Sequence, residues 1–265
     1  MIRWTVVVPF KGAADAKSRL SGSLGDDERA AIALAFLVDT VSAVARVAAV
    51  SSVIVVSNQP GLAGTLGAVL GQDPGRADAE THVIADPGGG INTAVAAGLA
   101  HARAAAPDTF AAAITGDLAA LRPADLAQAF ALAEAAATSA QVLNERTGCS
   151  AGSRSEPVHG RRTFVPDREG SGTTMVSFAP GADAPTHFGI GSSAAHATAG
   201  YSPLDVPAES SLRLDIDDAD DLELARALGL GEASRAVLAR RVTPRSSDPS
   251  TPPAPAPGGG RGRAH

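Results

Sequence analysis

The sequence WTVVVPFKG, residues 4–12, decides the fold class of this chain. Its first five residues are rich in β-branched side chains and the run stops at Pro9, which is typical of a short strand buried on both faces. Lys11, Lys17 and Arg19 follow that strand closely. Because open α/β sheets bind ligands beyond the carboxyl ends of their strands, these cations are expected to hold a phosphate. An exposed basic loop without a ligand is the alternative.

Working outward from this stretch, strand-like and helix-like segments alternate. The expected strands cover residues 4–8, 52–57, 81–85, 110–115 and 141–143. The expected helices cover residues 26–47, 60–70, 92–106 and 123–137. Such alternation predicts an α/β fold with a Rossmann-like, mostly parallel sheet flanked by helices. After residue 144 the pattern loosens into loops and shorter strands.

Composition sets the domain organisation and excludes several classes of protein. With 265 residues, 45% of them hydrophobic, the chain can build a sizeable core. We expect one domain over residues 1–241 and a disordered tail rich in Pro, Gly and Arg over residues 242–265. A formal net charge of −6 argues against a nucleic-acid binder. A single cysteine excludes an intramolecular disulfide. No apolar run reaches membrane-spanning length and no secretory signal is apparent, so a cytoplasmic protein is expected.

A candidate metal ligand follows the fourth expected strand, in TGDLA, residues 115–119. An Asp at the end of a buried strand is costly unless it is paired or bound to a cation. Mg²⁺ takes one or two carboxylates together with substrate phosphate oxygens, so Asp117 is expected to bind Mg²⁺. The alternative is a helix N-cap, which Pro123 disfavours because it places the helix start several residues later.

A second acidic motif, LRLDIDDADDL, occupies residues 212–222. Alternation along an extended segment puts Asp215 and Asp217 on one face, so both are candidates for a further metal carboxylate. The next three acidic residues lie near the start of a helix, where the helix dipole favours negative charge. Those residues, Asp218, Asp220 and Asp221, are interpreted as helix-start residues.

Two motifs in the second half of the chain suggest an anion pocket. PDREGSGTT, residues 166–174, contains Arg168 and Thr174 in a glycine-rich loop suited to approach an anion. HFGIGSS, residues 187–193, contains Gly189 and Ser192 and enters a helix, where free N–H groups attract anions. Either motif alone could be a turn and a cap.

A third glycine-rich segment, DPGGGIN, occupies residues 86–92 between the third strand and its helix. Its glycines, Gly90 among them, permit close approach of a flat base. Asn92 could either cap the helix or contact a nucleotide. Both interpretations stay open from the sequence.

In their order along the chain, VVPFKGAADAKSRL, TGDLAAL, PDREGSGTTMV, HFGIGSS and LRLDIDDADDL resemble the guanylyltransferases of coenzyme F420 biosynthesis. The resemblance extends over about residues 3 to 229. It implies a GT-A-like nucleotidyltransferase fold and transfer of GMP from GTP to the phosphate of phosphoenolpyruvate, with release of diphosphate.

The resemblance also implies roles for individual residues. The family's phosphoenolpyruvate pocket matches Thr174, Gly189 and Ser192, with Arg168 as an additional candidate. We assign Asp117 and Asp217, together with Asp215, to Mg²⁺. We assign Lys11, Lys17 and Arg19 to the triphosphate, with Gly90 and Asn92 as further nucleotide contacts. GTP, the phosphorylated acid and the downstream transferase of the pathway are the implied partners.

Other functions stay open at this stage. The acceptor could be 2-phospho-L-lactate, which the sequence does not distinguish from phosphoenolpyruvate. A molybdenum-cofactor guanylyltransferase is disfavoured because it would carry a glycine-rich first loop. A GT-A glycosyltransferase is disfavoured by the lysine-rich first loop. Finally, a non-catalytic nucleotide-binding module would not need both acidic motifs.

Overall fold

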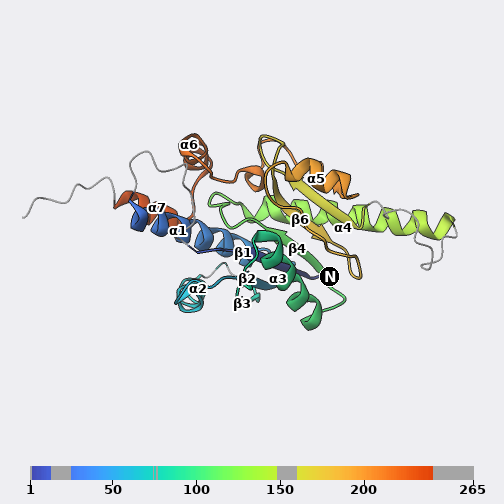
Figure 1. Cartoon of the computed structure of the whole chain (residues 1–265), viewed down its shortest axis with the longest axis horizontal. Helices are drawn as coiled ribbons and strands as arrows, with labels where there is room; N and C mark the ends of the chain where they lie inside the picture. Colours follow the sequence, from blue (N-terminus) through green and yellow to red (C-terminus); the bar gives the residue numbers. More distant parts are fainter. Residues whose placement is uncertain (1, 13–24, 74, 76, 148–159, 241–265) are drawn as a thin grey trace, which may run out of the picture.

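The computed structural model describes residues 2–12, 25–73, 75, 77–147 and 160–240. Seven strands form one sheet in the order β3-β2-β1-β4-β6-β5-β7 (Figure 1). The strands are β1 (Trp4–Pro9), β2 (Val50–Val56), β3 (Glu80–Ile84), β4 (Phe110–Ile114), β5 (Arg162–Pro166), β6 (Thr173–Phe178) and β7 (Ser202–Pro203). The helices are α1 (Asp26–Ala45), α2 (Leu62–Leu70), α3 (Ile91–Ala105), α4 (Pro123–Thr147), α5 (Ser192–Thr198), α6 (Ala219–Leu228) and α7 (Glu232–Ala239), with a 3₁₀ turn at Ser211–Arg213.

The sheet confirms the expected α/β architecture, a Rossmann-like and mostly parallel sheet flanked by helices. β1 pairs in parallel with β2 and β4, and β2 pairs in parallel with β3. β6 is antiparallel to both β4 and β5, so the looser second half of the sequence extends the same sheet. The carboxyl end of β4 therefore lies beside the start of β6.

The predicted strand at residues 141–143 is wrong, because α4 continues through it to Thr147. The hydroxyls of Thr138 and Ser139 donate to the carbonyl oxygens of Glu134 and Ala135 one turn earlier. These two polar residues therefore do not interrupt the helix. Val142, which suggested a strand, is an exposed residue of that helix.

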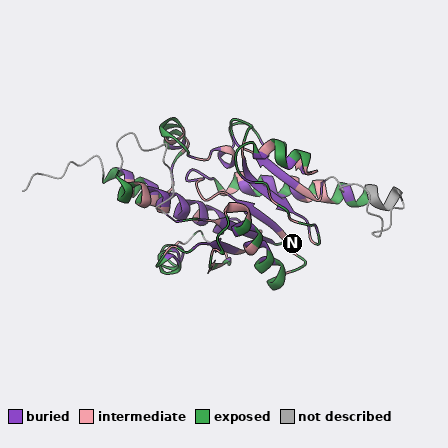
Figure 2. Cartoon of the chain, viewed as in Figure 1, coloured by how far each residue is buried: buried purple, intermediate pink, exposed green. Residues whose placement is uncertain are grey.

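The two faces of β1 bury side chains against different helices, as the sequence predicts for a strand covered on both sides (Figure 2). Trp4, Val6 and Val8 belong to a core shared with α1, α2 and α4. Val7 belongs to a second core, shared with α3. On the first face the indole ring of Trp4 stacks on Phe130 of α4 with ring centroids 4.0 Å apart.

A third core holds the acidic segment near the carboxyl end of β4. Leu214 and Ile216 are buried there with residues of α1, α6 and α7. Asp39 of α1 accepts hydrogen bonds from the backbone N–H groups of Ala233 and Ser234 in the first turn of α7. This interaction fastens α7 to α1.

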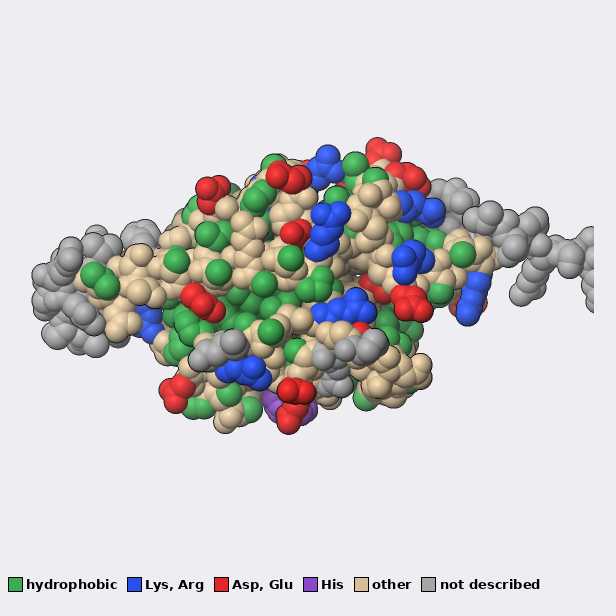
Figure 3. Space-filling model, turned by 180° about the vertical axis from the view of Figure 1, so that it is seen from behind, with side chains coloured by type: hydrophobic (Ala, Val, Ile, Leu, Met, Phe, Trp, Pro, Cys, Tyr) green, Lys and Arg blue, Asp and Glu red, His purple; other side chains and the backbone are tan. Residues whose placement is uncertain are grey.

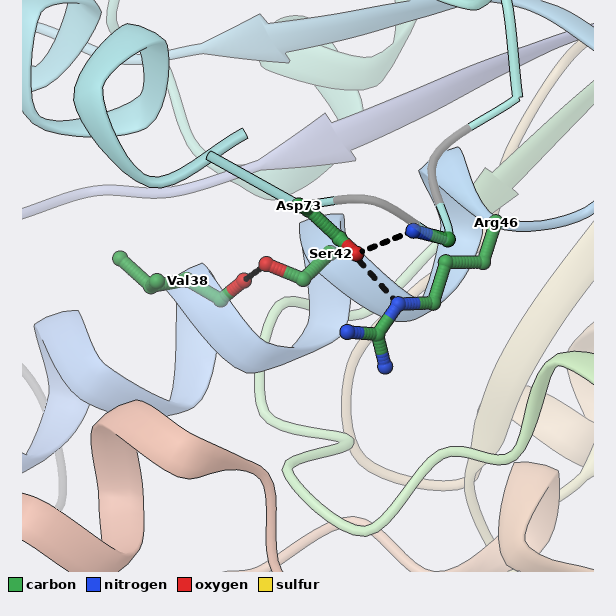
Figure 4. A network of polar contacts seen from close by, with 5 residues as sticks. Val38, Ser42, Arg46 and Asp73 are labelled. Atoms are coloured by element: carbon green, nitrogen blue, oxygen red, sulfur yellow. Dashed lines mark hydrogen bonds and ion pairs between the residues drawn. The ribbon is translucent and has the colours of Figure 1, made fainter. Parts of the chain in front are cut away.

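The end of α1 is tied to the turn that follows α2 (Figure 4). Arg46 Nε lies 2.8 Å from Asp73 Oδ2, and Asp73 Oδ1 accepts the backbone N–H of Gly75. Ser42 Oγ donates to Val38 O within α1. The ion pair holds the two helices together on the side of the sheet away from α3.

The surface seen from behind mixes charges of both signs with hydrophobic areas (Figure 3). Lys and Arg side chains lie among Asp and Glu side chains on that face, rather than in one basic stripe. Across the described residues, no helix is long and apolar enough to cross a membrane. The expected tail, residues 242–265, lies outside the described residues.

Candidate functional site

A cavity of about 200 Å³ opens at the carboxyl ends of β1 and β4. Its lining joins the loop after β1, the middle of α1, the start of α3 and the loop after β4. The lining residues are Pro9, Phe10, Lys11, Gly12, Ala33, Phe36, Asp86, Ile91, Ala94, Thr115, Gly116 and Asp117. It therefore brings together two of the predicted site residues, Lys11 and Asp117, from motifs about a hundred residues apart in the sequence.

Lys11 is exposed at the mouth of this cavity. Lys17 and Arg19 lie outside the described residues, so their assignment to a triphosphate stays a prediction. Phe10 and Phe36 give the cavity an apolar side, which the sequence did not predict. Among the described lining residues, the cation Lys11, the carboxylates Asp86 and Asp117 and the apolar walls together suit the flat base and the charged phosphates of a nucleotide.

The glycine-rich loop 86–90 borders the cavity and leads into α3. Gly88, Gly89 and Gly90 all have positive φ angles, between 80° and 103°, which favour glycine. Gly90 is the N-cap residue of α3, so the cap assignment that the sequence left open for Asn92 belongs to Gly90. The fifteen-residue helix α3 directs its free N–H groups toward this loop, where they favour an anion.

The side chain of Asn92 reaches the second half of the chain. Its Oδ1 accepts the backbone N–H of Phe188 at 2.8 Å, and its Nδ2 donates to the carbonyl oxygen of Phe188 at 3.0 Å. The amide is thus already occupied on both sides. A nucleotide contact by Asn92 stays a prediction.

The two acidic motifs lie side by side. The backbone N–H of Ile216 donates to the carbonyl oxygen of Asp117 at 3.3 Å. Because Leu214 and Ile216 are buried in the third core, Asp215 and Asp217 alternate with them, as the sequence predicts. Burial raises the pKa of Asp215 to about 8, and the negative charges of Asp117 and Asp217 add to this effect.

The remaining acidic residues of the second motif serve the start of α6. Asp218 is its N-cap residue and accepts the N–H groups of Asp220 and Asp221. The interpretation of these three as helix-start residues is confirmed. Asp117 has no such role at α4, because that helix begins at Pro123.

Asp167 is a further carboxylate that the sequence reasoning missed, although it lies in the PDREGSGTT motif. Its Oδ2 accepts the N–H of Gly172 at 2.6 Å, and its Oδ1 is buried with no hydrogen-bond partner among the described residues. The charge of Asp167 also contributes to the raised pKa of Asp215. Arg213 donates from Nε and Nη2 to the carbonyl oxygen of Asp167, which joins this loop to the acidic segment.

Four carboxylates therefore share one region, and this arrangement bears on Mg²⁺. Among the described residues, no group of three or more His, Cys, Asp and Glu side chains is arranged to hold a metal ion. Mg²⁺ is usually held by one or two carboxylates, with substrate phosphates and waters completing the shell. Asp117 and Asp215 fit that requirement, because burial and the neighbouring negative charges both raise the pKa of Asp215, and a bound cation would favour its ionised form.

Of the predicted acceptor residues, Thr174 is connected directly to the segment that carries Asp117. The backbone N–H of Thr115 donates to the carbonyl oxygen of Thr174 at 3.0 Å, which joins the end of β4 to β6. The Thr174 side chain is fully buried, and its Oγ1 lies 3.5 Å from Val165 O, at the limit of a hydrogen bond. Ser192 is also buried, in the first turn of α5, whereas Gly189 is exposed with φ +132°.

Arg168 is placed apart from the nucleotide-side cavity. It is exposed and lines a different cavity, with Glu209, Ser210 and Leu224 of the segments around α6. Among the residues that the structure describes, none lines both cavities. The structure therefore does not bring Arg168 together with Lys11 and Asp117, and its contact with the acceptor stays a prediction.

His196 in α5 is a second residue that the sequence reasoning missed. Its ring is fully buried; Nδ1 lies 3.1 Å from Thr173 Oγ1, and Nε2 accepts the backbone N–H of His187 at 3.1 Å. Burial, with a smaller contribution from the neighbouring His187, lowers the pKa of His196 to about 4. A neutral His196 thus joins β6 to the loop that carries Gly189.

Comparison with known proteins gives consistent results. A family described as "Guanylyl transferase CofC like" matches residues 4–135. A phosphoenolpyruvate guanylyltransferase of Streptomyces coelicolor is 41% identical over 240 residues, covering 90% of this chain and 97% of the relative. One of Streptomyces avermitilis is 38% identical over 244 residues, covering 92% and 97%. Among solved structures, a 4-diphosphocytidyl-2C-methyl-D-erythritol synthase is 15% identical with a TM-score of 0.49, covering 86% of this chain and 99% of that one.

Proposed function

Because this chain belongs to the CofC-like guanylyl transferase family, we propose that it transfers GMP from GTP to the phosphate of phosphoenolpyruvate and releases diphosphate. The product is enolpyruvyl-diphospho-guanosine. The proposed setting is coenzyme F420 biosynthesis, in which a downstream transferase consumes that product.

One observation carries the choice of phosphoenolpyruvate. The relatives with that name match about nine-tenths of this chain, so the similarity includes both the cavity half and the half with Thr174, Gly189 and Ser192. The same similarity disfavours 2-phospho-L-lactate and a molybdenum-cofactor precursor as acceptors. The geometry supports one site for both substrates, because the backbone N–H of Thr115, in the loop after β4, donates a hydrogen bond to the carbonyl oxygen of Thr174.

The proposed reaction does not need a general base. The acceptor phosphate is already an anion, so it can attack the α-phosphorus of GTP without losing a proton. The bond that forms joins an acceptor oxygen to the α-phosphorus, and the bond that breaks releases diphosphate. The barrier lies in bringing two anions together and stabilising the charge of the transition state.

The residues divide this work between the two halves. Lys11, with Lys17 and Arg19 of the same loop, neutralises the triphosphate. Asp117, with one of Asp215 and Asp217, would hold Mg²⁺, and the ion when bound would supply positive charge that neutralises phosphate oxygens. The N–H groups at the start of α3 add partial positive charge near Gly90.

The acceptor is held by donors from Thr174, Gly189 and Ser192. Gly189 offers its backbone N–H with no side chain in the way, at a φ angle that other residues rarely adopt. Hydrogen bonds to a charged group contribute roughly 1.5–3 kcal/mol each, so Thr174→Val or Ser192→Ala should raise the KM for the acceptor about tenfold or more. The KM for GTP should change little in either variant.

The proposal is tested by diphosphate release from each of GTP, CTP and ATP, with Mg²⁺ and each of phosphoenolpyruvate and 2-phospho-L-lactate. We expect release with GTP and phosphoenolpyruvate, and background rates for the other nucleotides. Higher kcat/KM with 2-phospho-L-lactate would overturn the acceptor assignment. A preference for CTP or ATP would overturn the assignment as a guanylyltransferase of GTP.

A further inference from the structure

We propose that Asn92 is a positioning residue for the acceptor, which it serves by fixing the backbone of Phe188 beside Gly189. The proposal rests on the assignment of Gly189 to the acceptor site. In this proposal a residue at the start of α3, the helix that borders the nucleotide cavity, orients the loop that binds the acceptor.

The geometry is a two-sided clamp. Asn92 Oδ1 accepts the N–H of Phe188 at 2.8 Å and Asn92 Nδ2 donates to the carbonyl oxygen of the same residue at 3.0 Å. Both hydrogen-bonding groups of one residue are thereby satisfied by one side chain, which fixes the orientation of the peptide groups on either side of it. One of those peptide groups supplies the N–H of Gly189.

The Phe188 side chain is anchored on the same helix. It is buried in the second core with Ala94 and Val95 of α3. The side chain fixes how deeply the loop sits, and the Asn92 amide fixes how its backbone is turned. Because Gly189 has no side chain of its own to orient it, its N–H direction depends on its neighbours.

The residue directly before Phe188, His187, is held from α5. His196 Nε2 accepts the N–H of His187, and its Nδ1 reaches Thr173 Oγ1 next to Thr174. The segment 187–189 is thus fixed between α3 and α5. Of the two anchors, Asn92 alone comes from the helix that borders the cavity with Lys11.

The chain supplies a matched control in Asn58. Its side-chain amide makes the same two-sided contact with the backbone of Asp86, at 2.8 Å and 3.1 Å. Asp86 lines the cavity on the nucleotide side. Asn58 and Asn92 therefore make equal contacts with opposite halves of the site.

The experiment measures KM for both substrates in Asn92→Ala, Asn92→Asp and Asn58→Ala. Asn92→Ala removes two hydrogen bonds and should raise the KM for phosphoenolpyruvate about tenfold, with the KM for GTP within about twofold. Asn58→Ala should do the opposite, raising the KM for GTP and sparing the acceptor. Equal effects of both alanine variants on both substrates would overturn the proposal.

Asn92→Asp separates positioning from packing. It keeps the shape of the side chain and the bond from the Phe188 N–H, but turns a carboxylate oxygen toward the Phe188 carbonyl oxygen. We expect it to raise the acceptor KM at least as much as Asn92→Ala does. An unchanged acceptor KM in a folded Asn92→Asp variant would show that Asn92 only fills space.

A second readout does not depend on the acceptor being phosphoenolpyruvate. Hydrogen exchange at the amide of Phe188 should accelerate at least tenfold in Asn92→Ala and stay unchanged in Asn58→Ala. If the wild type uses another acid as acceptor, the proposed function is wrong. The hydrogen exchange rate of the Phe188 amide and the KM for that acid then still test whether Asn92 positions the loop. Unchanged protection of Phe188 in Asn92→Ala would overturn the clamp itself.

Discussion

As the pH falls from 7 to 5, the wild type should lose stability relative to a His196→Gln variant, because His196 contributes a pH dependence that glutamine does not. Burial, with a smaller contribution from His187, lowers the pKa of His196 from 6.5 to about 4. The unfolded chain therefore binds a proton near pH 6.5 that the folded chain does not bind until about pH 4. Stability is fully present above pH 6.5 and is lost as the pH falls toward 4.

The size of the effect follows from the two pKa values. Between pH 6.5 and pH 5 the contribution of His196 to the free energy of unfolding falls by about 1.36 kcal/mol per pH unit. Over these 1.5 pH units the contribution falls by about 2 kcal/mol. For a domain of this size, about 2 kcal/mol corresponds to a fall in Tm of roughly 4–8 °C. Differential scanning calorimetry of the wild type and His196→Gln at pH 7, 6 and 5 measures it. Parallel pH profiles of the two proteins would refute the reasoning, whatever the offset between them at pH 7.

Three further predictions concern other parts of the molecule. Asp117→Ala should lose at least a hundredfold in kcat while its Tm stays within a few degrees, because a metal carboxylate is removed from the site and not from the core; near-normal diphosphate release would contradict its assignment to Mg²⁺. Gly98→Ala should destabilise the fold by about 1–3 kcal/mol, because a Cβ there would lie 2.4 Å from Val7 Cγ1. Gly67→Ala, which has open space around the added Cβ, should stabilise α2 by about 0.5–1 kcal/mol. Denaturant unfolding measures the free energy of unfolding of both variants. Deletion of residues 242–265 should leave Tm and activity nearly unchanged, and a fall in Tm above about 4 °C would show that the tail packs on the domain.

The sequence predicts the first half of the sheet well because each strand there is a short apolar run between helices. β1, β2, β3 and β4 fall within about two residues of their expected positions. The error at residues 141–143 has a physical origin: two apolar residues after Gln141 are too few to show a periodicity, and helix α4 continues through them. The antiparallel placement of β6 depends on long-range pairing with β4, which no local pattern encodes.

For the site, sequence motifs identified residues that carry charge but not those that orient the backbone. Lys11 and Asp117 are predicted because each follows the end of an expected strand, and Asp215 because it alternates with apolar residues in an extended segment. The contact of Asn92 with Phe188 joins residues 96 positions apart and leaves no local signature. No motif in the sequence singles out His196, because the burial of one isolated histidine depends on long-range packing that a local pattern does not encode.

The central claim, transfer of GMP to phosphoenolpyruvate, is tested most directly by the mass of the product. The full chain is incubated with Mg²⁺, phosphoenolpyruvate and GTP carrying ¹⁸O in the α-phosphate, and the downstream transferase is supplied to trap a labile product. We expect the label to appear in enolpyruvyl-diphospho-guanosine, or in GMP that the transferase releases from it. The amount of labelled product should equal the amount of diphosphate released. The contradicting result is obtained with the transferase omitted. If diphosphate is released but all of the label is found in free GMP and no enolpyruvyl-diphospho-guanosine forms, the chain does not transfer GMP to phosphoenolpyruvate.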